Sequence, residues 1–248
     1  MPLTNAKLVL AEAKTQLQEI EELYAQSLNE RNVPQRLLVK IKNFLENTRS
    51  PLDYCANYIF DTFCARHIDP NRLNKKKKSC YFPNKPSLED FNRNIDSEVF
   101  IGLRNDRPDI VSLFEKYQPF QTDVVWIKNL HALVNLNKHI DLTPQEKQIH
   151  HEHFLIDVKN SNVRDAKSES EFASLLKEKL NNAVSDLVQI NVETDVFHPP
   201  LNKPVPDFTL TKTWVSILFT TLNVPVIPTL NEILSGLESI INDFEEVI

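Results

Sequence analysis

Glycine is almost absent from this chain, in which Gly102 and Gly236 are the only two among 248 residues. An average soluble protein contains about 7% glycine, which would give roughly 17 in a chain of this length. Dinucleotide-binding loops (G-x-G-x-x-G), phosphate-binding P-loops and the G-x-S-x-G elbow of hydrolases each need several glycines close together. The sequence therefore excludes these common nucleotide and hydrolase sites. Any chemistry must come from side chains that project from rigid elements.

The hydrophobic pattern of the N-terminal part is that of long helices. Apolar residues recur every three or four positions over 5–30 and again over 34–66, which places them on one face of each helix. Asn32 and Pro34 mark the turn between these two segments. The pattern predicts a long antiparallel αα-hairpin. Beyond it, residues 69–86 are expected to form a loop, and three shorter helices are expected over 87–91, 107–119 and 123–138.

The pattern changes in the C-terminal half of the chain. Apolar and polar residues alternate as in half-buried strands over 154–158, 187–197 and 214–222, while helical spacing is found over 169–180 and 229–244. The predicted fold class is mainly α with a small antiparallel β part (α+β). A helical bundle with the long hairpin would be followed by a short sheet and a C-terminal helix. We expect a bundle domain over residues 1–145 and a second part over 146–248, packed on the bundle.

The net charge of −6 is unevenly distributed along the sequence. Residues 31–85 hold 12 basic and 4 acidic residues, a local net of +8, whereas residues 141–248 hold 8 basic and 17 acidic, a net of −9. The run Lys75, Lys76, Lys77 and Lys78 lies in the basic zone, where it would suit phosphate or RNA contact. A solvated loop would show the same run. The run also has no interleaved aromatic residues, which stacking of single-stranded bases would require.

The cysteines and the N-terminal residues indicate the compartment. Cys55, Cys64 and Cys80 are odd in number and contain no C-x-x-C pair, so neither a disulfide framework nor a cysteine zinc site is expected. The sequence has no signal-peptide pattern and no apolar run of about 18 residues. We therefore expect a cytoplasmic protein with reduced thiols, no membrane association and no cofactor.

Several segments, in order along the chain, resemble one family. Residues 47–54 (NTRSPLDY) are similar to N-x-R-S-x-L-D-H, residues 81–83 (YFP) to a short F-P segment, and residues 117–119 (YQP) to a Q-P-Y region. Residues 135–139 (NLNKH) are similar to N-x-[DN]-K-H, which follows a helix with a tryptophan, here Trp126. These motifs resemble those of an uncharacterised bacterial HEPN-like helical family. The resemblance implies a helical bundle, often a homodimer, in a superfamily with many RNA-cleaving toxins and defence proteins.

Nucleases of that superfamily carry R-x4-6-H, and this chain has no Arg five to seven positions before any His. The best polar group for catalysis is instead Arg49, Asp53, Lys138 and His139. Arg49 and Asp53 are four residues apart and can meet on one helix face. His139 would be the acid/base group, and Lys138 or Arg49 would hold a phosphate. A structural polar network that fixes helix register would use the same residues.

A metal site is the alternative suggested by the stretch His150–His153. On a strand, His151 and His153 would share a face and could chelate zinc, with Asp157 or His198 as a third ligand. A polar strand face explains the same residues with fewer requirements. No metal site is therefore predicted.

Two functions remain open on the sequence. The first is an RNA-binding or RNA-cleaving protein in a bacterial defence or toxin setting. The second is a non-catalytic interaction or oligomerisation module, in which the hairpin and the final amphipathic helix form a dimer interface.

Overall fold

The computed structural model describes the backbone of residues 3–28, 30, 32–139, 142, 144–156 and 208–248, and the side chains of these except 138–139, 150–156 and 208–214. The chain divides into two compact units. One comprises residues 1–146 and 217–248, and the other residues 147–216. In the part of the chain that the structure describes, no helix is long and apolar enough to cross a membrane.

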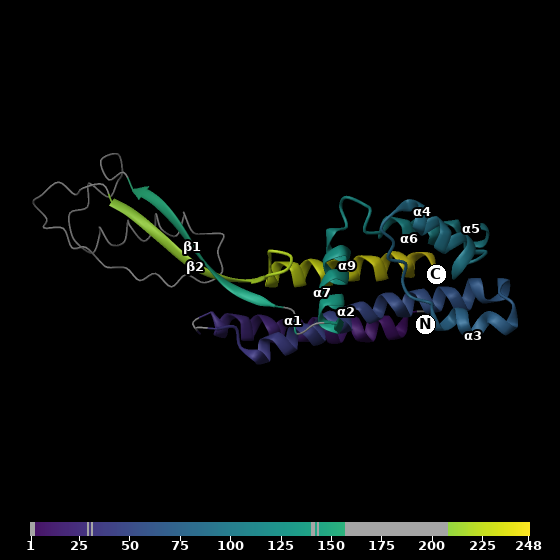
Figure 1. Cartoon of the computed structure of the whole chain (residues 1–248), viewed down its shortest axis with the longest axis horizontal. Helices are drawn as coiled ribbons and strands as arrows, with labels where there is room; N and C mark the ends of the chain where they lie inside the picture. Colours follow the sequence, from purple (N-terminus) through teal and green to yellow (C-terminus); the bar gives the residue numbers. More distant parts are fainter. Residues whose placement is uncertain (1–2, 29, 31, 140–141, 143, 157–207) are drawn as a thin grey trace, which may run out of the picture. The chain divides into compact units, whose positions relative to one another are not determined.

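The predicted αα-hairpin is confirmed. Helix α1 (Thr4–Ser27) packs along α2 (Gln35–Ile59), and the apolar side chains of both helices meet in the core (Figure 1). Helix α2 continues as one π-helical turn, η1 (Phe60–Cys64), and a 3-10 turn, η2 (Ala65–His67). The second arm of the hairpin therefore extends to His67.

The expectation of a loop over 69–86 is wrong for its first half, which forms helix α3 (Pro70–Lys78). Asp69 caps this helix, because its side chain accepts a hydrogen bond from the backbone N–H of Asn71 at 2.7 Å. Pro70 stands in the first helical turn, where its missing N–H costs nothing. The lysines fill the last turn, where positive charge is favourable to the helix dipole.

Shorter helices follow α3, as predicted. Ser87 caps α4 by accepting from the backbone N–H of Asp90 at 3.1 Å, which confirms the predicted N-cap. The chain then forms α4 (Leu88–Arg93), the π-helical turn η3 (Asn94–Glu98), α5 (Leu103–Asp106), α6 (Pro108–Lys116) and α7 (Val125–His139).

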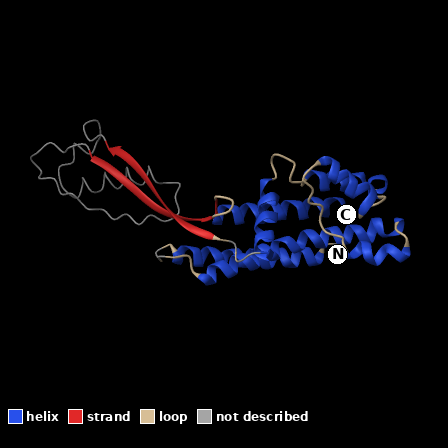
Figure 2. Ribbon diagram, viewed as in Figure 1, coloured by secondary structure: helices blue, strands red, loops and turns tan. Residues whose placement is uncertain are grey.

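The C-terminal part holds the strands and the last helix (Figure 2). Strands β1 (Gln145–Ile156), β2 (Phe208–Phe219) and β3 (Val224–Pro225) form a sheet in that order, and β2 and β3 are antiparallel, with Leu218 opposite Pro225. Helix α9 (Val226–Val247) follows. The chain is therefore mainly α with a small antiparallel sheet and a C-terminal helix, as predicted. The elements predicted over 169–180 and 187–197 lie outside the described residues.

Helix α9 belongs to the helical unit, whereas the sequence assigns it to the second part at 146–248. It packs against α1, α2, α6 and α7. Its apolar side is buried there, and Phe244 meets Phe114 edge to face, with ring centroids 5.2 Å apart. Burial of this apolar stripe explains why the helix joins the bundle rather than the sheet.

Each of the two glycines lies against an aromatic ring. A Cβ at Gly102 would lie 2.3 Å from the imidazole of His67, and one at Gly236 would lie 2.3 Å from the indole of Trp126. Gly102 also has φ +85°, in the left-handed region that L residues with side chains rarely adopt. The few glycines thus stand where the backbone conformation or the packing requires them.

Candidate functional site

A stripe of polar residues runs along α2 and its π-helical extension. Arg49, Asp53, Asn57 and Asp61 are spaced four residues apart, which places neighbouring members on the same side of the helix. We call these four residues the α2 stripe. Arg49 and Asp53 were predicted from the sequence as site residues, whereas Asn57 and Asp61 were not, although the four-residue spacing continues through them.

Three members of the α2 stripe hold the segment 77–82. The Asp61 carboxylate pairs with the Lys77 ammonium at 2.7 Å. The Asn57 amide donates to the Cys80 carbonyl at 3.3 Å, and Asp53 Oδ1 accepts from the Phe82 backbone N–H at 3.0 Å. The segment therefore runs antiparallel to α2, with one anchor for each turn of the helix.

The fourth member, Arg49, lies beside Asp53. Its Nε is 3.9 Å from Asp53 Oδ2, and the two side chains are 24% and 25% exposed. The pair that the i, i+4 spacing predicts is therefore present and partly open to solvent. Because Asp53 also anchors a backbone N–H, its first role in this arrangement is structural.

The far end of the extended segment is fixed by a buried amide. Gln118 donates to the carbonyls of Pro83 and Phe114 at 2.9 and 2.8 Å, and its oxygen accepts from the backbone N–H of Lys85 at 3.0 Å. Three of the motif regions, 47–54, 81–83 and 117–119, thus meet through hydrogen bonds to one stretch of backbone. The motif residues build a polar network that secures this stretch.

Lys138 and His139 complete the predicted catalytic group, and both lie in the last turn of α7. Their side chains fall outside the described residues, so their proximity to Arg49 and Asp53 stays a prediction. Among the ligands of the metal alternative, the side chains of His150–His153 and all of Asp157 and His198 also lie outside them. Within the residues that the structure describes, no three His, Cys, Asp or Glu side chains are grouped as metal ligands.

The lysine run lies on α3, which carries five basic residues and no acidic one in nine positions. Lys76 donates to the backbone carbonyl of Glu98 at 2.6 Å, and Lys77 pairs with Asp61. Arg72, Lys75 and Lys78 are exposed, and the described part of the structure contains no side-chain partner for them. The helix therefore presents uncompensated positive charge to solvent.

A second polar cluster lies at the end of the hairpin, and it was not predicted from the sequence. Arg66 Nη2 and His67 Nε2 both lie 2.5 Å from Asp106 Oδ2. The hydrogen bonds from His67 and Arg66 lower the pKa of the Asp106 carboxyl. The three residues come from positions about 40 apart, and no short motif signals their meeting. The cluster ties η2 to the end of α5.

The three cysteine thiols are poorly suited to act as nucleophiles. Cys55, Cys64 and Cys80 are all buried and free, and burial raises the pKa of each to about 12. They are therefore protonated at neutral pH, which suppresses thiolate chemistry.

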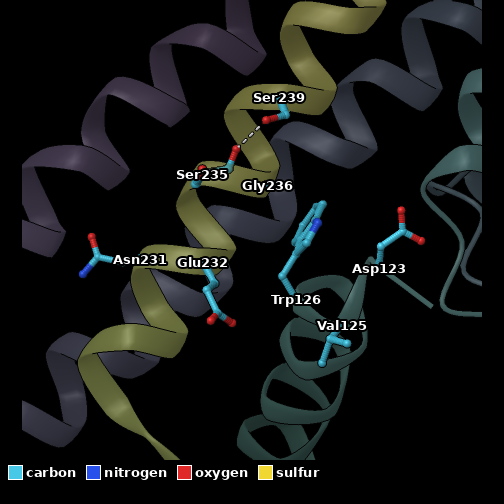
Figure 3. Close-up of a pocket in the computed structure, with 8 residues that line it drawn as sticks. All are labelled: Asp123, Val125, Trp126, Asn231, Glu232, Ser235, Gly236 and Ser239. Atoms are coloured by element: carbon cyan, nitrogen blue, oxygen red, sulfur yellow. Dashed lines mark hydrogen bonds between the residues drawn. The ribbon is translucent and has the colours of Figure 1, made fainter. Parts of the chain in front are cut away.

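An open depression of about 610 Å³ lies between the start of α7 and the middle of α9 (Figure 3). Its wall contains the Trp126 indole beside Gly236, and Ser239 Oγ is occupied by a hydrogen bond to the Ser235 carbonyl at 3.0 Å. The lining contains two carboxylates and no histidine, lysine, arginine or cysteine: Asp123, Val125, Trp126, Asn231, Glu232, Ser235, Gly236 and Ser239. This depression does not hold a catalytic group of the kind the sequence suggests.

Comparisons of the chain with models of protein families, with curated proteins and with solved structures find no match. The α2 stripe and α3 are therefore the features of this chain from which a function can be inferred.

Proposed function

We propose that this protein binds RNA through the exposed basic face of α3. The observation that carries the proposal is the set of exposed cations, Arg72, Lys75 and Lys78, on a helix without acidic residues. Lys75 and Lys78 are three residues apart and lie on one helix face. Closely spaced cations with no acidic partner attract the phosphates of a nucleic acid and release its counterions. The HEPN-like resemblance supports RNA as the nucleic acid.

The structure of the α2 stripe favours binding over cleavage. Asp53 accepts a backbone hydrogen bond and Asn57 donates one, so both act as anchors of the segment 77–82. Such bonds position a backbone segment, whereas the acid/base group that the sequence suggests is His139. Cleavage would thus depend on Lys138 and His139. Incubation with RNA separates the two activities, because a protein that only binds leaves the RNA intact.

The rival function, an oligomerisation module, was expected to use the hairpin and the final helix. The apolar faces of α1, α2 and α9 are buried against one another within one chain. Two acidic residues of α9 are likewise paired within the chain, Glu238 with Lys14 at 2.6 Å and Asp243 with Lys116 at 2.6 Å. A homodimer would need another surface, and light scattering of the purified protein tests for one.

The experiment measures binding of a fluorescently labelled RNA by anisotropy, at salt concentrations from about 50 to 200 mM. Lys75→Ala/Lys78→Ala should weaken binding and lower the slope of log affinity against log salt by about 1 to 2. Arg36→Ala/Lys128→Ala removes the same charge from exposed side chains of α2 and α7 and is the matched control. Equal weakening by both double variants, or no binding by the wild type, would overturn the proposal.

A further inference from the structure

Two tyrosines are exposed, one in the segment that follows the basic helix and one next to the residue that anchors this segment. Tyr54 on α2 is 43% exposed, and Tyr81, three residues beyond Lys78, is 56% exposed. In the part of the chain that the structure describes, these are the only aromatic residues among the exposed large hydrophobic ones. Single exposed apolar residues are ordinary on a protein surface, so the positions of these two residues relative to each other and to α3 decide whether they form a site.

The α2 stripe brings the two tyrosines to the same place. Tyr54 follows Asp53 in the sequence, and Tyr81 precedes Phe82, whose N–H bonds to Asp53 at 3.0 Å. One turn further on, Asn57 holds the carbonyl of Cys80, the other neighbour of Tyr81. Tyr54 and Tyr81 are 27 positions apart in the sequence, yet each is the sequence neighbour of a residue in the hydrogen bond between Asp53 and Phe82.

The same stripe holds α3 at the end of the hairpin, a few residues before Tyr81 in the chain. Lys77, in the last turn of α3, pairs with Asp61 of the α2 stripe, so α3 lies alongside the end of the hairpin (Figure 1). Its exposed cations, Lys75 and Lys78, precede Tyr81 on this continuous stretch of chain. We call the set Arg72, Lys75, Lys78, Tyr54 and Tyr81 the tyrosine–lysine face.

We propose that the tyrosine–lysine face binds single-stranded RNA, with bases stacked on Tyr54 and Tyr81 and phosphates on the cations of α3. This inference rests on the proposed function and names the form of RNA that is bound. Aromatic rings beside cations are the combination that holds unpaired bases, since every base offers a π-face. No aromatic residue is interleaved with the lysines in the sequence; Tyr81 follows three residues after the run, and folding brings Tyr54 to the same segment. In a duplex the faces of the bases are covered by stacking, so the tyrosines would have nothing to bind.

The rings are also well prepared for stacking. Tyr54 stands on a helix, and Tyr81 on an extended segment held at Cys80 and Phe82 by α2 and beyond Phe82 by Gln118. Tyrosine has only two side-chain torsions, so little conformational entropy is lost when its ring packs against a base. The anchored backbone keeps that loss small.

The test compares a labelled oligouridine of about 12 nucleotides with an RNA duplex of the same length, by anisotropy at one salt concentration. Tyr54→Ala/Tyr81→Ala should weaken binding of the single strand roughly tenfold or more and leave duplex binding unchanged. Tyr54→Phe/Tyr81→Phe keeps the rings and should bind like the wild type. Leu8→Ala/Val125→Ala removes exposed apolar side chains elsewhere and is the control, with circular dichroism to verify folding of each variant.

The outcomes separate the two proposals. If the wild type binds neither RNA, the proposed function fails, and this inference fails with it. If Lys75→Ala/Lys78→Ala weakens binding while the tyrosine variants do not, the proposed function stands and the stacking role is overturned. Equal affinity for single strand and duplex in the wild type would likewise overturn the inference. Selective loss of single-strand binding in Tyr54→Ala/Tyr81→Ala, with rescue by phenylalanine, would support it.

Discussion

The carboxylate of Asp53 accepts a hydrogen bond from the backbone N–H of Phe82, with a distance of 3.0 Å between Oδ1 and N. This contact joins the middle of α2 to the segment after α3, across 29 residues of sequence. A charged acceptor makes a stronger hydrogen bond than a neutral one, and a buried N–H without a partner is costly. The bond therefore determines where the chain goes after the basic helix.

We predict that Asp53→Ala destabilises the protein by about 1–3 kcal/mol, because it leaves the N–H of Phe82 unpaired. The segment should also open locally, and the buried thiol of Cys80, now bonded to the Ala56 carbonyl, should become reactive. Urea unfolding measures the first effect, and the rate of thiol labelling, assigned to Cys80 by mass spectrometry, measures the second.

The control for this variant is Asp61→Ala. It breaks the pair with Lys77, in which both side chains are about half exposed, so its cost should stay below about 1 kcal/mol. Equal destabilisation by the two variants, with unchanged labelling of Cys80, would show that the Phe82 hydrogen bond does not anchor the segment.

The elements with a clear apolar period could be predicted from the sequence. The hairpin and α9 carry stripes that suit one buried face, and their burial in the core agrees with that pattern. Helix α3 could not be found in this way, since PNRLNKKKK has a single apolar residue. Its helical state depends on the Asp69 cap and on neighbours such as Asp61 that hold its lysines.

The candidate site was predictable only where its residues are close in sequence. Arg49 and Asp53 could be paired because four residues make about one turn of a helix. The contacts of Asp53 with Phe82 and of Asp106 with His67 depend on how the chain folds back, which local spacing does not specify. The same holds for the nearness of Tyr54 and Tyr81. The structure thus adds Tyr54 and Tyr81 to the proposed site, whose lysines were visible in the sequence.

We predict that Gly236→Ala destabilises the protein, although helix propensity alone predicts a gain of stability. Alanine in place of glycine inside a helix usually gains about 0.5–1 kcal/mol. Here the new methyl group would lie 2.3 Å from the Trp126 ring, which is largely buried and cannot simply move aside. We expect a net loss of about 1–3 kcal/mol, as in other overpacked cores. Chemical denaturation measures it.

Ser235→Ala, at the exposed neighbour of Gly236, is the matched control for that variant. It should be neutral or slightly stabilising, because the serine side chain faces the open depression and alanine is the better helix former. A gain of stability in Gly236→Ala as well would mean that the contact between α7 and α9 is looser than the structure shows.

We predict that Gly102→Ala costs stability for two separable reasons. The residue has φ +85°, which alone costs about 1 kcal/mol for alanine, and its Cβ would collide with the His67 ring at 2.3 Å. His67→Ala/Gly102→Ala removes the collision and keeps only the backbone cost. A double-mutant cycle on urea unfolding should therefore show the glycine variant to be less harmful in the absence of the imidazole. Strict additivity would contradict the contact between His67 and Gly102.

The cluster of Arg66, His67 and Asp106 should make stability depend on pH in the acid range. Hydrogen bonds from His67 and Arg66 hold the pKa of Asp106 below its ordinary value of 3.8. The folded state therefore prefers the carboxylate, and this contribution is complete above about pH 4, where Asp106 is also ionised in the unfolded chain. It is lost as the pH falls through the lower pKa of the folded state.

We therefore expect the wild type to have a higher melting temperature than Asp106→Asn from neutral pH down to about pH 4, with the difference shrinking below that. Thermal unfolding of both proteins between about pH 2 and 7 measures it. The difference between the two proteins isolates Asp106 from the other carboxylates, which titrate in both. A difference that stays constant to the lowest pH, or that grows there, would mean that His67 and Arg66 do not stabilise the ionised form of Asp106.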